Sequence, residues 1–388
     1  MYKRQLHALT YFSPHISGLT IYVERLARGL VRSGHEVTVL TSHYDHALPL
    51  EETIDGVRIV RVPVVARLSK GVIMPTVGQV ASRLMQRHDL VHLHLPQFDG
   101  AGLALRAKLA RRPVTLTYHC DIELPRGALN AIAQPVIHMA NHIAARWTDT
   151  LVAYTDDYAR HSPFLSRYLA KLKVIPPPVE IDQPSPEDLA AFRAKWGLNG
   201  GPVIGMVARL ATEKGVEVLV NALELVRRSA PDARVLFAGP YQNVLGEAEY
   251  ARRLQPHFDA LGAAWTFTGS LRGRELASFF ASLDAHVLPS LNSTESFGLV
   301  QVEAMLSGTP CVCSDLPGVR VSVRETGMGE VVPIGDAPAL AAAILRVIAD
   351  RARYTRPRAE IAARFSTDRS VAEYVALYED LIARRTRK

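Results

Sequence analysis

The sequence predicts an α/β protein built from two parallel-sheet domains. Apolar segments of strand length alternate with segments of helical periodicity along the whole chain. That alternation is typical of a parallel sheet covered by helices on both faces. A proline-rich run, Ile175–Val179, interrupts the series. Because consecutive prolines continue neither a helix nor a central strand, we interpret this run as the link between a domain over residues 1–178 and another over residues 179–366.

In the first domain, strands are expected to alternate with helices, of which one is predicted over Ile21–Ser33 before the stop at Gly34. The predicted strands are Leu6–Phe12, Glu36–Thr41, Val57–Val62, Leu90–His94, Val114–His119 and Thr150–Tyr154.

The second domain repeats this pattern, with helices expected over Gly215–Arg228, Arg274–Leu283 and Phe297–Leu306. Its predicted strands are Val203–Val207, Arg234–Ala238, Trp265–Thr268, His286–Pro289 and Thr309–Ser314. A last helix, about Thr367–Ala383 within residues 367–388, is expected to pack back on the first domain. Two such domains in tandem place a cleft between the carboxyl ends of two sheets.

Composition excludes several classes of protein. Of the 388 residues, 48% are hydrophobic and 21% are charged, which are ordinary globular values and exclude disorder, collagen and coiled coil. Three cysteines, Cys120, Cys311 and Cys313, are too few for a disulfide framework, and an odd number fits a reducing compartment. Cys311 and Cys313 lie two residues apart in an apolar run, so we interpret them as core residues on one strand face.

The amino-terminal residues lack the apolar stretch of a signal peptide, and no apolar run is long enough to cross a membrane, so we expect a cytoplasmic protein. The net charge of +7 is uneven, because residues 1–180 hold 21 Lys and Arg against 14 Asp and Glu, and residues 181–388 hold 24 against 24. Solvated helix faces explain such an excess of positive charge. Attraction to the anionic inner face of a membrane, or to acidic substrates, explains it equally well. No motif favours nucleic acid.

The segment Pro289–Pro310 is the most informative part of the chain. A strand is expected to end at Pro289, a loop to carry Glu295, and a helix to begin near Phe297 with Glu303 two turns in. Eight residues span about 12 Å along a helix, which is too far for an acid–base pair. The spacing suits two anchors on one elongated ligand, such as a sugar and a ribose joined by a diphosphate, which the free amides at the helix start would favour.

A second segment, Gly205–Gly215, carries two cations after a buried strand. Arg209 and Lys214 are expected at the carboxyl end of that strand, where ligands bind in sheets of this kind. Two cations there would neutralise a diphosphate leaving group as its charge develops. Each segment alone is more often a solvated loop or a pair of unrelated glutamates, so the inference depends on finding both.

Together, Arg209-x4-Lys214-Gly and Glu295-x7-Glu303 resemble the retaining GT-B glycosyltransferases of family four, the glycosyl transferases group 1. The segment Ser13–Gly18 is similar to the opening of that family, and the resemblance covers nearly the whole chain. It implies two Rossmann-like domains that face each other across a cleft, with the donor mostly on the second domain and the acceptor on the first.

The resemblance also implies roles for individual residues. Glu295 would contact hydroxyls of the donor sugar, Glu303 would contact the ribose, and Arg209 and Lys214 would bind the diphosphate. The implied donor site is Gly18, Arg209, Lys214, Glu295, Ser296, Phe297, Gly298, Leu299 and Glu303, and the implied catalytic residues are His119, Glu295, Arg209 and Lys214.

The first domain supplies further candidates. His119 and Asp121 follow a predicted strand, and the resemblance implies that His119 hydrogen-bonds the donor sugar while Asp121 lies towards the acceptor. His15 is a second candidate acceptor contact. Gly18 belongs to a glycine-rich loop whose backbone would approach the donor phosphate and the acceptor. Ser17 stands where the family often has a glycine, which predicts a stiffer loop.

No metal and no cofactor is expected, and the nucleotide sugar serves as co-substrate. The chain has no Asp-x-Asp motif. His92 and His94 share one side of a strand, but no third ligand follows at helical or turn spacing, which argues against zinc. The stretch Arg67–Pro75 mixes two cations with apolar residues, and it is either core and loop or an acceptor-site lip that enters lipid headgroups.

Together with the family resemblance, these observations predict a metal-independent retaining hexosyltransferase that uses a UDP- or GDP-sugar and a glycan or lipid-linked acceptor, in cell-envelope polysaccharide or glycolipid synthesis. The leaving diphosphate would help to deprotonate the acceptor on the face that it departs from. Two alternatives stay open: a nucleotide-sugar epimerase or glycan phosphorylase of the same architecture, and a two-domain sugar-binding protein without catalysis.

Overall fold

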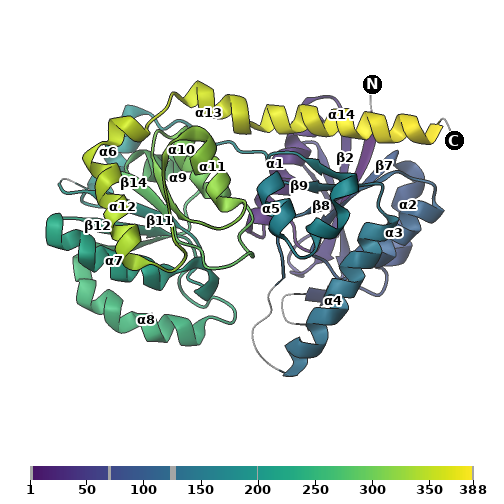
Figure 1. Cartoon of the computed structure of the whole chain (residues 1–388). Helices are drawn as coiled ribbons and strands as arrows, with labels where there is room; N and C mark the ends of the chain where they lie inside the picture. Colours follow the sequence, from purple (N-terminus) through teal and green to yellow (C-terminus); the bar gives the residue numbers. More distant parts are fainter. Residues whose placement is uncertain (1–2, 69–70, 123–127, 199, 387–388) are drawn as a thin grey trace. The chain divides into compact units, whose positions relative to one another are not determined.

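The computed structural model describes residues 3–68, 71–122, 128–198 and 200–386, which fall into two compact units (Figure 1). Unit 1 comprises Met1–Pro178 together with Phe365–Lys388, and unit 2 comprises Val179–Arg364. The first boundary falls within the proline-rich run. Each unit has an apolar core of its own, so each can be described by itself.

Unit 1 is built on an eight-stranded sheet in the order β10-β9-β8-β7-β1-β2-β4-β3. Neighbouring strands are parallel except β3 and β4, which pair antiparallel. The strands are β1 (Arg4–Ala8), β2 (Glu36–His43), β3 (Glu51–Ile54), β4 (Val57–Pro63), β7 (Leu90–Leu95), β8 (Val114–Tyr118), β9 (Thr150–Ala153) and β10 (Leu172–Val174). A separate hairpin is formed by β5 (Ala66–Leu68) and β6 (Gly71–Ile73).

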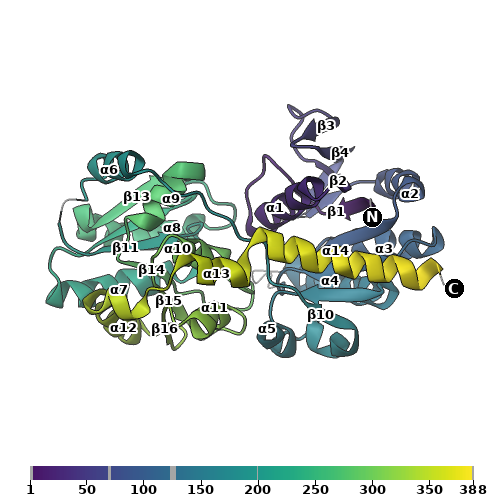
Figure 2. The ribbon, with the colours of Figure 1, turned by 90° about the horizontal axis from the view of Figure 1, so that it is seen from above.

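Helices of unit 1 follow β1, β6, β7, β8 and β9, and the last helix of the chain belongs to this unit. They are α1 (Gly18–Arg32), α2 (Val77–Arg87), α3 (Gly100–Leu109), α4 (Ala128–Trp147), α5 (Asp156–His161), the 3-10 helix η1 (Leu165–Lys171) and α14 (Thr367–Thr386). Helix α14, yellow in Figure 2, packs against α1. The hydroxyls of Tyr22 on α1 and Tyr374 on α14 lie 2.5 Å apart in the buried contact.

Unit 2 is a six-stranded parallel sheet in the order β13-β12-β11-β14-β15-β16. Its strands are β11 (Val203–Val207), β12 (Arg234–Ala238), β13 (Trp265–Gly269), β14 (Ala285–Leu288), β15 (Cys311–Ser314) and β16 (Gly329–Val332). Its helices are α6 (Pro186–Lys195), η2 (Thr212–Lys214), α7 (Val216–Ser229), α8 (Ala248–Leu261), η3 (Gly262–Ala264), α9 (Gly273–Ala281), α10 (Leu299–Leu306), α11 (Val319–Thr326), α12 (Ala337–Ala349), η4 (Arg351–Tyr354) and α13 (Arg358–Phe365).

In each sheet the order of strands reverses at one point. In unit 2, β11 lies between β12 and β14, and in unit 1, β1 lies between β2 and β7. Loops that leave the carboxyl ends of strands on the two sides of such a point diverge, and ligands of open α/β sheets bind in the space between them. The loops after β11 and β14, and those after β1 and β7, are therefore where the topology of each unit favours a site.

The predicted parallel α/β class is confirmed, and several predicted boundaries are wrong. Strand β1 ends at Ala8 rather than Phe12, because the Thr10 carbonyl accepts hydrogen bonds from the backbone N–H and hydroxyl of Ser42 and leaves the regular ladder. Helix α10 begins at Leu299 rather than near Phe297, because Gly298 adopts a left-handed conformation (φ 77°). Cys311 and Cys313 are fully buried core residues, as predicted. Among the described residues, no helix is long and apolar enough to span a bilayer.

Candidate active site and family

The loop after β11 presents the two predicted cations. Arg209 follows this strand and pairs with Glu213, with 2.8 Å between a guanidinium nitrogen and a carboxylate oxygen. The loop ends in the short 3-10 helix η2, whose last residue is Lys214. The side chain of Lys214 is 18% exposed and that of Arg209 is 39% exposed, so Arg209 is the more accessible of the two cations.

The loop after β14 carries Glu295 to the same edge of the sheet. The backbone N–H of Glu295 donates to the Asn292 carbonyl, and the Asn292 side chain accepts from both the N–H and the hydroxyl of Thr294, at 3.2 Å and 2.6 Å. One oxygen of the Glu295 carboxylate accepts the N–H of Gly298 at 3.0 Å. The carboxylate therefore lies just before α10, in a loop that is ordered by its own hydrogen bonds.

Lys214 and Glu295 join the two loops. The Lys214 ammonium lies 2.8 Å from the second oxygen of Glu295, and both side chains are 18% exposed. Burial alone would lower the pKa of Lys214, but the carboxylates of Glu295 and, to a smaller extent, Glu213 together outweigh burial and raise that pKa above its ordinary value. A cation with a raised pKa keeps its charge at neutral pH and loses it only under strongly alkaline conditions. The structure thus brings together two predicted residues that are 81 positions apart.

Gly215 allows this close approach. It has a left-handed conformation (φ 67°), and a Cβ there would lie 2.1 Å from the carbonyl oxygen of Pro289. A backbone hydrogen bond from Leu291 N–H to the Glu213 carbonyl, 2.9 Å long, ties the same two loops. Only glycine fits where the backbones touch, so this residue sets the distance between the Lys214 loop and the Glu295 loop.

The remaining donor residues of unit 2 lie on or beside α10. Glu303 is 4% exposed on this helix, and Ser296 and Phe297 are 5% and 1% exposed in the preceding turn. One of the amides predicted to face a ligand at the start of this helix is already used, because the N–H of Gly298 donates to the Glu295 carboxylate. Leu299 is the first helical residue and is half-buried.

Sequence reasoning missed Ser290, which lies two residues beyond the end of β14. Its hydroxyl is fully buried, and the part of the chain that the structure describes offers it no hydrogen-bond partner. Buried hydroxyls are nearly always hydrogen-bonded, so this hydroxyl at a strand end is a candidate contact for a polar ligand atom or a water molecule. A lone serine after a proline carries no sequence signal that would distinguish it from an ordinary loop residue.

In unit 1, Gly18 and His15 follow β1. Gly18 is the first residue of α1, and a Cβ added to it would have no neighbour within 4 Å, which leaves its backbone accessible. Ser17 caps this helix, with its hydroxyl accepting the N–H of Thr20 at 3.1 Å, so it has a structural role at the position where the family often has a glycine. The His15 ring stacks on Tyr11, with 4.8 Å between ring centroids.

Asp121 is 6% exposed near the carboxyl end of β8. Its backbone N–H donates to the Tyr158 hydroxyl at 2.6 Å, and its Oδ1 accepts from Tyr118 and Ser162 at 3.2 Å and 2.7 Å. Its Oδ2 is buried without a hydrogen-bond partner among the described residues. Asp121 is therefore firmly held, and only one of its oxygens is left to meet another group.

His119 comes directly after β8, and both nitrogens of its ring are engaged. Nδ1 makes a short hydrogen bond with the Tyr154 hydroxyl, and Nε2 lies 3.0 Å from Nδ1 of His94. Burial lowers the pKa of His119 to about 3, so the ring is neutral near pH 7. The predicted contact between this ring and a donor sugar would have to pass through Tyr154 or take its place.

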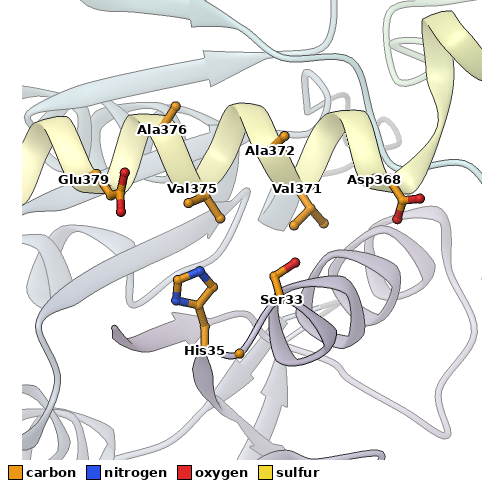
Figure 3. A pocket seen from close by; sticks show the side chains of 9 residues that line it. Ser33, His35, Asp368, Val371, Ala372, Val375, Ala376 and Glu379 are labelled. Atoms are coloured by element: carbon orange, nitrogen blue, oxygen red, sulfur yellow. The ribbon is translucent and has the colours of Figure 1, made fainter. Parts of the chain in front are cut away.

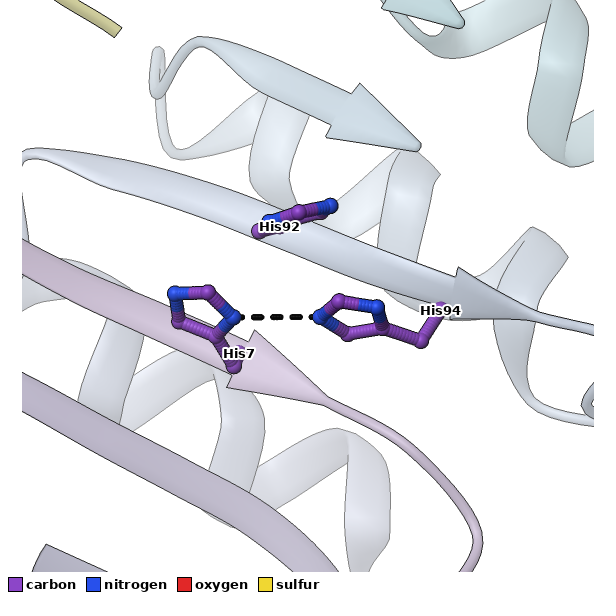
Figure 4. Close-up of side chains that lie close together, drawn as sticks. All are labelled: His7, His92 and His94. Carbon is purple, nitrogen blue, oxygen red and sulfur yellow. Dashed lines mark hydrogen bonds between the residues drawn. The ribbon is translucent and has the colours of Figure 1, made fainter. Parts of the chain in front are cut away.

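His92 and His94 of β7 meet a third imidazole, His7, from the neighbouring strand β1 (Figure 4). One nitrogen from each ring lies within 4.8 Å of the others, which is compatible with a metal site. However, His92 already bonds Tyr378 and Thr117, both at 2.7 Å. The sequence spacing around His92 and His94 could not indicate the third imidazole, because His7 comes from a strand 85 residues earlier in the chain.

Unit 1 also contains a cavity of about 630 Å³ between the end of α1, the start of β2 and α14 (Figure 3). It adjoins His35, at the amino end of β2, where open α/β sheets do not bind their ligands. It is therefore separate from the candidate site. Its lining consists of Ser33, Gly34, His35, Asp368, Val371, Ala372, Val375, Ala376 and Glu379.

Comparison with known families accounts for both units. Residues 189–364 match the family "Glycosyl transferases group 1", and residues 17–178 match the "Glycosyl transferase 4-like domain". The structure is similar to a sucrose-phosphate synthase from Thermosynechococcus elongatus (TM-score 0.77, 22% identity, 98% of this chain and 99% of the other). It is also similar to Anabaena Alr3699/HepE in complex with UDP-glucose (TM-score 0.75, 21% identity, 96% and 99%).

Two relatives are similar in sequence over most of their length. A GDP-mannose-dependent alpha-mannosyltransferase of Mycolicibacterium smegmatis is 30% identical over 359 residues, covering 88% of both chains. A D-inositol 3-phosphate glycosyltransferase of Nocardia farcinica is 31% identical over 363 residues, covering 87% of this chain and 78% of the other. The chain therefore belongs to the glycosyl transferases group 1, the family-four glycosyltransferases of GT-B fold.

Proposed function

We propose that this glycosyltransferase transfers a hexose, with retention of anomeric configuration, from a nucleoside-diphosphate sugar to a polyol or glycan acceptor that is free or linked to a lipid. The Lys214–Glu295 pair at the reversal point of the unit 2 sheet is the observation that carries the proposal. It sets a cation for phosphate beside a carboxylate for sugar hydroxyls, at the edge where nucleotides bind in such sheets. GDP-mannose is the favoured donor, because it is named for two similar mycobacterial enzymes.

Each residue of the candidate site has a proposed part. Lys214 and the more exposed Arg209 neutralise the diphosphate, and the positive start of α10 adds to this field. Glu295 accepts hydroxyls of the hexose, and Glu303 accepts those of the ribose. Ser290 offers a further buried hydroxyl at the same edge.

The proposed reaction needs no covalent intermediate on the protein. As the bond between the anomeric carbon and the diphosphate oxygen breaks, the acceptor oxygen forms its bond to that carbon on the same face. The acceptor proton passes to the departing phosphate oxygen, so charge balances without a protein base. Arg209 and Lys214 stabilise the negative charge that develops there.

The acceptor is proposed to lie on unit 1, near His15, Gly18 and Asp121. Its class is suggested by the names of relatives, which act on D-inositol 3-phosphate or phosphatidyl-myo-inositol compounds. An anionic polyol also agrees with the basic first half of the chain (21 Lys and Arg against 14 Asp and Glu). A place in cell-envelope glycolipid or polysaccharide synthesis is part of this proposal.

Transfer assays test the proposal directly. We expect product from GDP-mannose with inositol phosphate or phosphatidylinositol as acceptor, and NMR of the product should show the α-anomer that the donor carries. A chelator should leave the rate unchanged, because protein cations rather than a metal neutralise the diphosphate. An inverted product would contradict retention, a rate abolished by chelator and restored by Mg²⁺ would contradict metal independence, and no transfer from any nucleotide sugar would contradict the function.

We further propose that unit 1 makes peripheral contact with an anionic membrane through α4. Four apolar residues at helical spacing lie on one exposed face of this helix: Val136, Met139, Ile143 and Trp147, which are 40–59% exposed. The adjoining helix α3 exposes Leu109 (75%) together with Arg106, and Arg146 is exposed on α4. Apolar residues beside cations are the pattern of interfacial membrane binding.

The hairpin formed by β5 and β6 supports membrane contact less well. Of the predicted lip Arg67–Pro75, residues 69–70 lie outside the described structure. Among its apolar residues, Val72 and Met74 are buried, and Ile73 is 48% exposed.

Vesicle flotation at low salt tests the α4 surface. We expect the protein to float with vesicles that contain anionic lipid, and Ile143→Glu to lose about tenfold in affinity, because it adds a charge of the wrong sign and removes an apolar contact. Leu245→Glu is the matched control, since Leu245 is 70% exposed but lies in unit 2. Equal flotation of the two variants, or none for the unchanged protein, would contradict the contact.

A further inference from the structure

Three hydrogen-bonded histidines cross the sheet of unit 1. His7 lies on β1, His94 on β7 and His119 directly after β8, and these strands are neighbours. The Nδ1 atom of His7 lies 3.1 Å from Nε2 of His94, as the dashed line in Figure 4 marks, and Nδ1 of His94 lies 3.0 Å from Nε2 of His119. The three rings are at most 5% exposed. They form one continuous row, which we call the histidine chain.

Each end of the histidine chain has a polar partner. At the His7 end, Nε2 faces the side-chain carbonyl oxygen of Gln5 at 3.5 Å. At the His119 end, Nδ1 meets the hydroxyl of Tyr154, which follows β9. Gln5 and Tyr154 are 1% and 6% exposed, so solvent does not compete strongly for these contacts.

The chemistry of neutral imidazole gives the histidine chain a direction. Burial lowers the pKa of all three rings, to about 3 for His7 and for His119, so each is neutral near pH 7. A neutral ring has one N–H and one lone pair, so each bond fixes the polarity of the next. Only two arrangements satisfy both hydrogen bonds between the rings: all three protons on Nε2, or all three on Nδ1.

The two ends select between these arrangements. With protons on Nε2, His7 donates to the Gln5 carbonyl oxygen and Tyr154 donates to His119. With protons on Nδ1, the lone pair of His7 faces the lone pairs of that carbonyl, which is repulsive. A phenol is also a better donor than acceptor towards an imidazole nitrogen. The Tyr154 end therefore favours protons on Nε2. The Gln5 end agrees with it in the orientation that the amide has here, in which Nε2 of Gln5 is buried without a hydrogen-bond partner among the described residues.

We propose that His7 and His94 are positioning residues that hold His119 in the Nε2–H tautomer, so that the Tyr154 hydroxyl donates its hydrogen bond to Nδ1 of His119. Any further group that bonds the Tyr154 oxygen must then donate to it. This inference rests on the proposed function in one respect: under that function, the group that donates to the Tyr154 oxygen is a hydroxyl of the donor sugar. The tautomer itself does not depend on any substrate.

His92 provides the control that this proposal needs. It lies two residues before His94 on the same strand face and is equally buried, with 4.1 Å between the two ring centroids. It bonds Tyr378 and Thr117, and is not part of the histidine chain. Replacing His92 or His94 by phenylalanine makes the same change in the same core, but only His94→Phe interrupts the histidine chain.

Nitrogen-15 NMR of histidine side chains in the unmodified, metal-free protein is the first test. We expect His7, His94 and His119 each to show a protonated Nε2 and an unprotonated Nδ1, assigned by single substitutions. A protonated Nδ1 on any of the three would overturn the proposal, without any need for a variant to fold. So would a stoichiometric bound metal in the purified protein that replaces the proton between His7 and His94.

The variants then test the coupling. In His94→Phe, the tautomer ratio of His119 should shift towards Nδ1–H by about tenfold or more, because the acceptor of its Nε2–H is lost. His92→Phe should leave that ratio unchanged. His94→Asn can place a side-chain oxygen where Nδ1 lies and should restore it. An unchanged ratio in His94→Phe, or an equal shift in His92→Phe, would overturn the proposal.

Activity separates this inference from the proposed function. If the protein is a transferase, His94→Phe should lower kcat/KM for the donor by about tenfold, and His94→Asn should recover most of it. A failure of transfer in the unmodified protein would count against the proposed function and leave the tautomers as the test of the histidine chain. Normal transfer with the wrong tautomer would overturn only the inference.

Discussion

Lys214→Ala and Glu295→Ala are each expected to lose at least about 100-fold in kcat/KM for the donor, the size of effect that follows loss of one group stabilising a transition-state charge. In the proposed site, Lys214 would supply positive charge for the diphosphate, and Glu295, which holds Lys214 in place, would contact the sugar. Because each residue holds the other at 2.8 Å, the double variant should be hardly worse than either single one. Steady-state kinetics on the three variants measure this.

A second lysine–glutamate ion pair provides the control for a general loss of stability. Lys195 and Glu275 form an ion pair of similar length, 2.7 Å, in the same unit, but their side chains are 57% and 43% exposed. Lys195→Ala should therefore retain full activity. Both lysine variants should unfold cooperatively, and Lys214→Ala should lose no more than about 3 kcal/mol of unfolding free energy. Full activity in Lys214→Ala or Glu295→Ala would refute the assignment of the site.

Gly215→Ala should affect both stability and activity. An alanine in the left-handed conformation costs about 1–2 kcal/mol. The additional overlap between Cβ and the Pro289 carbonyl, at 2.1 Å, forces the two loops apart at a further cost of about 1–3 kcal/mol. The same displacement separates Lys214 from Glu295, so donor kcat/KM should fall by about 100-fold even in the fraction that remains folded.

Gly269→Ala isolates the conformational part of this effect. Gly269 is also left-handed (φ 75°) and lies in the same unit, but a Cβ there would have no neighbour within 4 Å. Gly269→Ala should therefore lose only the about 1–2 kcal/mol of unfolding free energy that the left-handed conformation costs, and it should keep its activity. Thermal or urea unfolding of both variants gives the difference. If Gly215→Ala were as stable and as active as Gly269→Ala, the loop contact would have no part in shaping the site.

Much of the fold could be predicted because the alternation of apolar strands and helices is a local signal. The carboxyl-end location of Arg209 and Lys214 follows from it. The elements that were missed are of a different kind. Strand β3 is short and exposed and pairs antiparallel, and β5 and β6 form a hairpin of three residues each, so neither carries a buried apolar run.

The site shows the same division between local and distant information. The spacing between Glu295 and Glu303 is local and could be read from the sequence, whereas the contact of Glu295 with Lys214 joins loops 81 residues apart. The engagement of both His119 nitrogens depends on His94, which lies on β7, and on Tyr154, which directly follows β9. Contacts of this type are created by the order of strands in the sheet, which the sequence pattern does not specify.

Calorimetric titration of the purified protein with GDP, UDP, ADP and dTDP, in the absence of metal, tests the central claim most directly. We expect one nucleoside diphosphate to bind selectively, with GDP favoured. Glu303→Ala should weaken that binding by about 10–100-fold through loss of a charged hydrogen bond to the ribose. Glu360→Ala, a change at an exposed glutamate on α13 in the same unit, should bind as the unchanged protein does. No binding by any of the four, or equal binding by Glu303→Ala, would contradict the site described here.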